Sequence, residues 1–310
     1  MNLKQENDLL EQALSVAEEG YEKAYRFLLD AYEKAPGEFG PQTLYFLACL
    51  SGGAGLSGEA LGWLRTSIRD NGWWYRPEVL IDDDLAALEE DPEFLALRAA
   101  SDARYSAAVR TTQAELSWQS KTASRLFLAV HGNTQNAQTA AADWTPVLAE
   151  DASWQLETVQ SAEPDGFGTF RWSYDQTSYL PVAAAMEKLQ AAGYEKIVCG
   201  GFSAGCDMLL RAVTFADARC DALILQSPWL PVLGEHAAEA VSALQKKGIV
   251  LRILCGAEDE DCLPLAETLF AQAKKAGLDV TLTVQEASRH QFPEEPYTLR
   301  QILSGGAAHE

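Results

Sequence analysis

The sequence IVCGGFSAGC, residues 197–206, decides the fold expected for this chain. Its first half is a short apolar run typical of a buried strand, and an apolar pattern with helical spacing continues to Val213. Between them stands the pattern G-x-S-x-G, with Ser203 at its centre. The flanking glycines allow a turn so tight that the serine takes a strained backbone conformation and projects its Oγ. The N–H groups that begin the helix point toward the same place, so the segment predicts an exposed nucleophile beside a site for negative charge.

The residues around this segment, 111–310, are expected to form one α/β domain. Apolar, β-rich runs alternate there with helical stretches, and an antiparallel edge strand is expected at 113–118. The expected strands are 126–130, 154–159, 197–199, 222–225, 249–254 and 280–284, with helices at 182–192, 237–245 and 264–276. Such alternation predicts a mostly parallel sheet covered by helices on both faces.

Residues 1–110 contain helical patterns only, and we expect a separate helical domain there. The pair Ala24 and Leu28 recurs with the same spacing as Ala60 and Leu64. This resembles the second helix of the tetratricopeptide repeat, in which a small residue lets neighbouring helices approach closely. A helical bundle without repeats is the alternative.

Composition and charge exclude several classes of function. The net charge of −21 opposes binding to nucleic acids and to anionic membrane surfaces. No apolar run approaches the roughly 18 residues that span a bilayer. Because the N-terminal residues also lack the pattern of a signal peptide, we expect a cytoplasmic protein. The six cysteines are scattered, with no C-x-x-C pair and no histidine at metal spacing, so we expect no metal, no cofactor and no disulfide.

Four histidines are available as a general base. His309 lies in the low-complexity tail, and His236 is expected at a helix start. His131 ends the strand at 126–130, and His290 follows the last expected strand. Functional sites of open α/β sheets form at the carboxyl ends of strands, which favours the last two. His290 is the expected base, and His131 is expected to support the loop that follows it.

An acid is expected after the strand at 249–254, where the chain reads GAEDEDCLP at residues 256–264. The spacing from the glycine favours Asp259, with Asp261 as the rival. In a triad a histidine takes the proton of the serine during attack and returns it to the leaving group, and the carboxylate holds the imidazole in the required tautomer. Ser203, Asp259 and His290 occur in one of the known chain orders for such a triad.

The fourth expected element is an oxyanion hole. The sequence His131-Gly132-Asn133 follows the first strong strand. In this arrangement one backbone donor comes from the loop after that strand and the other from the residue after the nucleophile. The expected donors are Asn133, with Gly132 as the alternative, and Ala204.

Taken together, residues 112–303 resemble an α/β-hydrolase, and are most similar to the small lid-less esterases of the phospholipase/carboxylesterase and dienelactone-hydrolase groups. The resemblance rests on LFLAVHGN (126–133), FRWSYD (170–175), IVCGGFSAGCDMLLRA (197–212), LILQSPWLP (223–231), RILCGAEDEDCLP (252–264) and SRHQFP (288–293). It departs from the family pattern at Cys206, where glycine is more usual, and over 166–175 apart from Trp172.

The substrate is less clearly indicated. Only residues 226–248 separate two successive strands, which leaves no room for the helical cap that lipases insert there. Trp172 and Trp229 are the candidates for contacting the substrate, and packing in the core is the alternative for each. The N-terminal helices either wall the active site or offer a groove to a protein or peptide partner.

These observations predict a serine hydrolase that cleaves a carboxylic ester through an acyl-enzyme on Ser203. A small-molecule ester is the expected substrate, and a thioester is the less favoured one. Two alternatives remain open. One is a peptidase or acylaminoacyl-type hydrolase acting on amides, and the other is a catalytically inert scaffold built on the helical repeats.

Overall fold

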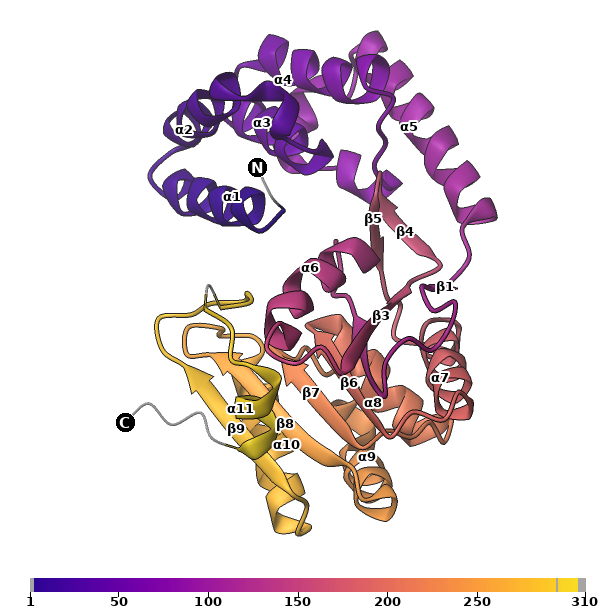
Figure 1. The fold of residues 1–310 in the computed structure, drawn as a ribbon. Helices are drawn as coiled ribbons and strands as arrows, with labels where there is room; N and C mark the ends of the chain where they lie inside the picture. The colour runs from indigo at the N-terminus through magenta and orange to yellow at the C-terminus, as the bar shows by residue number, and fades with distance from the viewer. Residues whose placement is uncertain (1–2, 294, 306–310) are drawn as a thin grey trace. The chain divides into compact units, whose positions relative to one another are not determined.

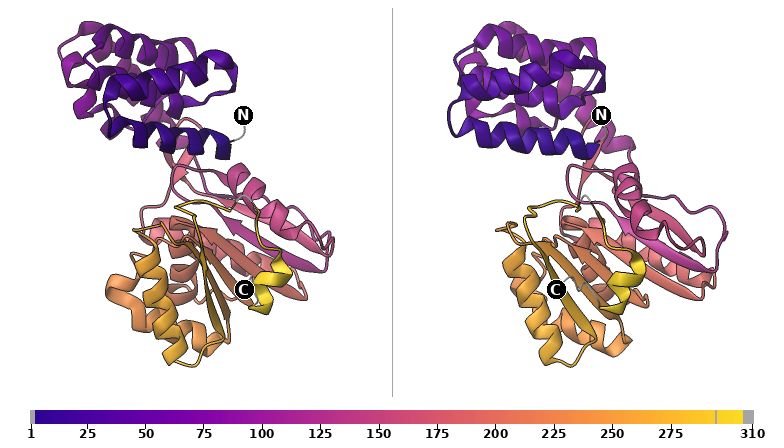
Figure 2. Two further views of the ribbon diagram at one scale, coloured as in Figure 1. Left: turned by 90° about the vertical axis from the view of Figure 1, so that its left-hand side faces the viewer. Right: turned by 60° about the vertical axis from the view of Figure 1, so that its left-hand side comes forward.

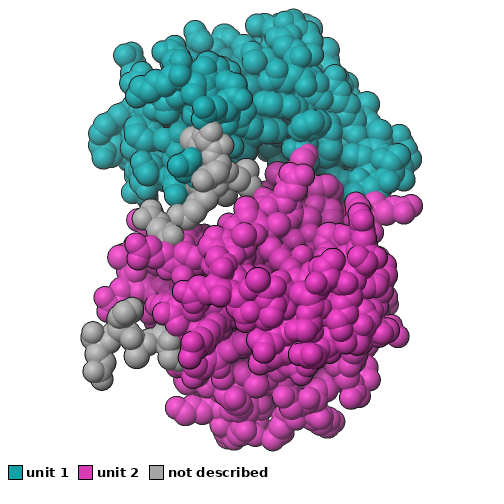
Figure 3. All heavy atoms as spheres, viewed as in Figure 1, with its two compact units in different colours: residues 1–112, 164–167 teal, residues 113–163, 168–310 magenta. Residues whose placement is uncertain are grey.

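The structure is a computed structural model that describes residues 3–293 and 295–305. His309 lies outside the described residues. The chain divides into two compact units, which are coloured separately in Figure 3: unit 1 comprises residues 1–112 and 164–167, and unit 2 comprises residues 113–163 and 168–310. Each unit is described here by itself.

Unit 1 is helical. Its helices are α1 (Leu3–Ala17), α2 (Tyr21–Lys34), η1 (Pro36–Glu38), α3 (Pro41–Gly53), α4 (Ser57–Leu64), η2 (Arg65–Asp70), η3 (Pro77–Leu80), η4 (Asp83–Leu88) and α5 (Pro92–Thr111). Helix α1 packs on α2, α2 on α3 and α3 on α4. Asp91 caps α5 by accepting hydrogen bonds from the backbone N–H groups of Glu93 and Phe94, and a proline occupies the first turn.

The recurring small and apolar residues of unit 1 lie on packed helix faces. Ala24 and Leu28 of α2 and Ala60 and Leu64 of α4 are all buried. The indole of Trp63 donates a hydrogen bond of 3.1 Å to the hydroxyl of Tyr25, which joins the two helices. The structure therefore contains successive helical hairpins; their assignment to the tetratricopeptide class stays a prediction.

A short segment from the second half of the sequence belongs to unit 1, which the sequence did not indicate. The backbone N–H of Phe167 donates to the carbonyl of Trp74 at 3.0 Å, and Gly166 forms a bridge with Tyr75. Arg76 forms an ion pair of 3.2 Å with Asp165. Two separate stretches of the chain, residues 1–112 and 164–167, therefore form the helical unit.

Unit 2 is built on a seven-stranded sheet with the order β1-β3-β2-β6-β7-β8-β9 (Figure 1). Its strands are β1 (Glu115–Leu116), β2 (Arg125–Val130), β3 (Trp154–Gln160), β6 (Lys196–Phe202), β7 (Ala222–Gln226), β8 (Val250–Gly256) and β9 (Val280–Gln285). All neighbours pair in parallel except β1, which is antiparallel to β3. A separate hairpin, β4 (Glu163–Gly166) and β5 (Thr169–Arg171), follows β3.

Helices cover both faces of this sheet (Figure 2). On one face α7 (Gln176–Ala191), α8 (Ala204–Phe215), α9 (Leu233–Lys247) and α10 (Leu263–Lys275) enclose the larger core, in which Met186 and Leu209 are fully buried. On the other face α6 (Ala137–Leu148) and α11 (Leu299–Ser304) enclose a smaller one, in which Phe127 packs on Trp144 at 4.8 Å between ring centroids. The central strands are apolar because both of their faces are covered.

The predicted α/β fold is confirmed, including the strand positions and the antiparallel edge strand. Only α9 lies between β7 and β8, as the length of that segment required. Among the described helices, none combines the length and apolar character that a membrane crossing needs.

Candidate active site

Ser203 stands at the turn between β6 and α8. Its backbone angles are φ 49° and ψ −120°, a conformation that costs a non-glycine residue on the order of 1–3 kcal/mol. The turn also brings helix and strand into close contact, because a Cβ on Gly205 would lie 2.5 Å from the carbonyl oxygens of Val130 and His131. The side chain of Ser203 does not cap α8. The strain expected of a nucleophile at such a turn is therefore present.

Backbone strain is concentrated at one edge of the sheet. Of the described residues other than glycine, six have a positive φ: Thr134, Tyr174, Ser203, Asp217, Ser227 and Ala287. Four of the six follow the carboxyl ends of β2, β6, β7 and β9 in the seven-stranded sheet, and Tyr174 follows β5 of the separate hairpin. Strained residues of this kind persist where the surrounding structure over-determines them, and they cluster at functional sites. The strained residues therefore gather at the carboxyl ends of the parallel strands, where Ser203 also lies.

Asp259 and His290 meet at this edge. Asp259 follows β8 and is 3 % exposed, and His290 follows β9 with its side chain 42 % exposed. The His290 Nδ1 lies 2.8 Å from Asp259 Oδ2. Burial acts to raise the pKa of Asp259, but the hydrogen bond and charge of His290 and the backbone N–H of Cys262 outweigh it and lower the pKa. Asp259 is therefore the ionised acceptor, and Nδ1 carries the proton.

Two backbone hydrogen bonds join the loop after β8, which carries Asp259, to the end of β9 and the loop that carries His290. Glu258 N–H donates to the carbonyl of Ser288, and Ala257 N–H donates to that of Gln285, each at 2.9 Å. The rings of His290 and Phe202 lie 5.1 Å apart between centroids, which places the imidazole beside the residue that precedes Ser203. Asp261, the rival acid, is exposed to solvent.

The loop after β2 lies against the nucleophile. A Cβ on Gly132 would be 3.2 Å from the Cβ of Ser203. The Gly132 N–H already donates to Oε1 of Gln135 at 2.8 Å, which leaves it unable to serve as an oxyanion donor. The side chain of Asn133 is also engaged: Oδ1 accepts from the N–H of Trp172 at 2.9 Å, and Nδ2 donates to the hydroxyl of Tyr174 at 3.0 Å. Of the two donors expected in this loop, the bond made by Gly132 favours the backbone N–H of Asn133, whose role stays a prediction.

His131 holds the loop after β2, which carries Gly132 and Asn133, by hydrogen bonds. It is 0 % exposed, and its Nε2 accepts from the backbone N–H of Ser161 at 3.1 Å. Its Nδ1 therefore carries the proton and donates to the carbonyl of Gly132 at 2.7 Å. Burial lowers the pKa of His131 to about 4, so the ring is neutral at pH 7.

The two tryptophans expected to contact substrate have different surroundings. Trp172 is 2 % exposed, stacks on His131 at 4.8 Å and donates from its indole to the His131 carbonyl at 2.8 Å. Its side chain is thus occupied in supporting the loop after β2. Trp229 is 37 % exposed, and its backbone N–H donates to the Ser203 carbonyl at 3.3 Å. Of the two, Trp229 has the surface available for a ligand.

The segment that carries Trp229 is held by a buried ion pair. Asp207 of α8 is 0 % exposed, pairs with Arg211 and accepts a hydrogen bond of 2.9 Å from the backbone N–H of Val232. Burial raises the pKa of Asp207, against the effect of Arg211. The charged groups therefore fix the loop after β7 on the start of α8.

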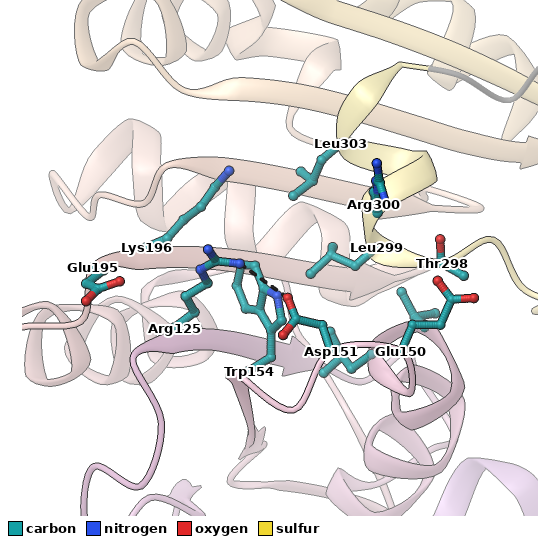
Figure 4. Close-up of a pocket in the computed structure, with 12 residues that line it drawn as sticks. Arg125, Glu150, Asp151, Trp154, Glu195, Lys196, Thr298, Leu299, Arg300 and Leu303 are labelled. Carbon is teal, nitrogen blue, oxygen red and sulfur yellow. Dashed lines mark hydrogen bonds and ion pairs between the residues drawn. The ribbon is translucent and has the colours of Figure 1, made fainter.

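Figure 4 shows a pocket of about 610 Å³ at the other end of the sheet. Arg125, Trp154 and Lys196, which line it, are the first residues of β2, β3 and β6. Arg125 is paired with Asp151 at 3.2 Å, as the dashed line marks. Because Ser203, Asp259 and His290 follow the carboxyl ends of their strands, this pocket is not part of the candidate active site.

Sequence reasoning missed three residues of this site. Tyr174 holds Asn133, Gln135 occupies the Gly132 N–H, and Cys262 places its Sγ 3.4 Å from Nδ1 of His290. The pattern FRWSYD contained Tyr174 but gave no sign of its positive φ. Contacts between loops that are far apart in the chain leave no periodic signal in the sequence.

Comparison with known proteins found one family model and several solved structures that resemble the chain. Residues 5–109 match a family model described as the N-terminal domain of A/B hydrolase-like proteins. A search of the curated proteins found no match. Among solved structures, an uncharacterized protein from Bacillus cereus ATCC 10987 is 29 % identical, with 95 % of each chain covered and a TM-score of 0.52.

Two further structures cover a smaller share of the chain. Esterase PE8 is 16 % identical, with 59 % of this chain and 93 % of that chain covered and a TM-score of 0.47. Acyl-protein thioesterase 2 from Zea mays is 15 % identical, with 59 % and 94 % covered and a TM-score of 0.42. The sheet order and the turn at Ser203 give unit 2 the α/β-hydrolase fold.

Proposed function

We propose that this protein is a serine hydrolase that cleaves carboxylic esters through an acyl-enzyme formed on Ser203. The observation that carries the proposal is the hydrogen bond of 2.8 Å between His290 and the buried Asp259. The loops that carry these two residues are joined by backbone hydrogen bonds, and they lie beside the strained turn of Ser203. A structural ion pair has no need of a strained serine at the same edge of the sheet.

In the proposed reaction His290 acts as general base and then as general acid. With Nδ1–H donated to Asp259, the Nε2 lone pair is free to accept the proton of the Ser203 hydroxyl during attack. Nε2 then delivers that proton to the departing alcohol. Water repeats the sequence on the acyl-enzyme and releases the acid. Asp259 holds the tautomer and stabilises the imidazolium.

The negative oxygen that forms during attack would be bound by the backbone N–H groups of Asn133 and Ala204. Ala204 begins α8, so its N–H has no partner within the helix. Each such donor lowers the barrier by roughly 3–4 kcal/mol. The exposed indole of Trp229 would contact the acyl or alcohol part of the substrate.

An ester is the proposed substrate, and an amide is the alternative to be tested against it. The matching test is turnover of p-nitrophenyl esters of increasing acyl length against p-nitroanilides of the same acids, with the full chain. Ester turnover without detectable anilide turnover supports the proposal, whereas turnover of the anilides would indicate an amide hydrolase.

The role of Ser203 is tested by a pair of alanine variants. Ser203→Ala should abolish turnover, and Ser242→Ala on α9 should keep it, since Ser242 lies outside the candidate site. Equal activity of the wild type and Ser203→Ala would reject the acyl-enzyme. If the folded wild type turns over none of these substrates, the inert-scaffold alternative gains support.

A further inference from the structure

The pair of Asp259 and His290, together with Cys262, brings an oxygen, a nitrogen and a sulfur atom that can bind a metal ion close to one another. Sγ of Cys262, Nδ1 of His290 and a carboxylate oxygen of Asp259 all lie within 4.8 Å of one another. The Sγ–Nδ1 distance is 3.4 Å and the Nδ1–Oδ2 distance is 2.8 Å. Cys262 stands at the start of α10, and His290 comes from the loop after β9. The cluster is therefore assembled by the fold from two separate segments.

These donors suit zinc in both type and spacing. Zinc binds cysteine sulfur at about 2.3 Å and histidine nitrogen at about 2.0–2.1 Å, in tetrahedral geometry. Those bond lengths separate two ligand atoms by roughly 3.5 Å. The Sγ–Nδ1 distance of 3.4 Å is close to this value, and the Nδ1–Oδ2 pair needs to open by about 0.7 Å.

Access to the cluster is from the side of His290. Cys262 is 1 % exposed and Asp259 is 3 % exposed, whereas the His290 side chain is 42 % exposed. An ion arriving past the imidazole would meet two buried ligands and keep one coordination position open to solvent. A site with three protein ligands and one open position is a normal arrangement for zinc.

We propose that Asp259, Cys262 and His290 form an inhibitory zinc site. Binding of Zn²⁺ at this site needs no turnover, and only its inhibitory consequence rests on the proposed function. The ion would act as a reversible inhibitor of the hydrolase and not as its cofactor.

The proton balance explains the inhibition. Cys262 loses its thiol proton to solvent as the Zn–S bond forms. The Nδ1–H···Oδ2 bond breaks, Zn²⁺ takes the place of the proton on Nδ1, and the single proton of the neutral imidazole then sits on Nε2. An Nε2–H group has no lone pair with which to accept the proton of Ser203. General-base catalysis is therefore lost while the fold is kept.

A second cluster in unit 1, formed by Cys49, Asp82 and Asp84, does not support the same inference. The Tyr45 hydroxyl donates to Oδ2 of Asp82 at 2.6 Å. This cluster contains no imidazole, so an ion bound there would not touch the proposed general base.

Binding is tested first, without substrate. Full-length protein stripped with a chelator is dialysed against ZnCl₂ alone, and then titrated with Co²⁺ as a spectroscopic substitute. We expect one ion per chain, with a thiolate-to-cobalt charge-transfer band in the near ultraviolet. Cys262→Ser should lose the band, while Cys220→Ser, at a residue that precedes β7 and lies outside the cluster, should retain it. Absence of zinc binding or of the band in the wild type would overturn the proposal.

Inhibition is tested next with a p-nitrophenyl ester, each variant being compared with its own metal-free rate. We expect Zn²⁺ to inhibit the wild type reversibly, with recovery on adding chelator. In Cys262→Ser, or in Cys262→Ala if the serine variant does not fold, the half-inhibitory concentration should rise at least tenfold. Cys220→Ser should behave as the wild type. An unchanged half-inhibitory concentration in both Cys262 variants would reject the site. If the wild type lacks ester turnover but binds zinc through Cys262, the proposed function fails and the metal site stands.

Discussion

His290 donates a hydrogen bond from Nδ1 to Oδ2 of Asp259 at 2.8 Å, although the two residues stand 31 positions apart in the chain. The bond links the ends of two neighbouring parallel strands, β8 and β9. It orients the imidazole beside the turn that carries Ser203, and the consequences of that arrangement can be measured.

The identity of the acid can be tested with two matched substitutions. Asp259→Asn should lower kcat by roughly 10³–10⁴-fold, because an amide at this position no longer enforces the tautomer with Nδ1–H. Asp261→Asn changes an exposed side chain and should leave kcat near the wild-type value. Steady-state kinetics with one ester measure both, and a larger loss in Asp261→Asn would reverse the assignment.

The placement of the loop after β2 can be tested at Gly132. Gly132→Ala adds a Cβ that would lie 2.9 Å from the Phe202 ring and 3.2 Å from the Ser203 Cβ. The loop must shift, which withdraws the Asn133 N–H and should lower kcat by up to about 10²–10³-fold, the effect of one lost donor. Gly234→Ala on α9, where a Cβ meets nothing within 4 Å, is the matched control. Equal kcat values for the two variants would argue against an oxyanion hole at Asn133.

The buried His131 predicts a pH dependence of stability. Its pKa is lowered from 6.5 to about 4, so the unfolded chain binds a proton in a range where the folded protein does not. The contribution of His131 to the free energy of unfolding is complete above pH 6.5 and is lost as the pH falls toward 4. We expect the free energy of unfolding to fall by about 2 kcal/mol between pH 7 and pH 5 from this group. Urea unfolding at these two pH values measures the loss, and His131→Asn should reduce it. The same loss in the variant would assign the effect to other groups.

Asp207 is expected to hold the loop that carries Trp229. Asp207→Ala leaves Arg211 and the Val232 N–H without their buried partner, and should destabilise the protein by about 3 kcal/mol. Asp207→Asn keeps an acceptor for Val232 and should lose less. Thermal unfolding ranks the two variants, and equal losses would show that the hydrogen bond to Val232 contributes nothing.

The sequence was informative where a residue's role depends on its neighbours in the chain. The turn at Ser203, the parallel strands and the edge strand all follow from local patterns of apolar residues and glycine, and the structure has them. The strand order then brings Asp259 and His290 to one edge. Local patterns therefore predicted the fold, and with it the end of the sheet at which the candidate site lies.

The rest of the site depends on contacts that local patterns do not encode. The side chain of Asn133 bonds to Trp172 and Tyr174, and the buried thiol of Cys262 meets His290 across two loops. Residues 164–167 leave the α/β unit to join the helical one, and no composition signal marks them. Each of these depends on the three-dimensional placement of segments that are distant in sequence.

The most direct test of the central claim is covalent labelling by an active-site-directed fluorophosphonate, followed by peptide mapping. The account predicts stoichiometric modification of Ser203 in the wild type, no modification of Ser203→Ala, and much slower modification of His290→Ala. Labelling at another residue, or no labelling of a wild-type protein shown to be folded, would contradict it.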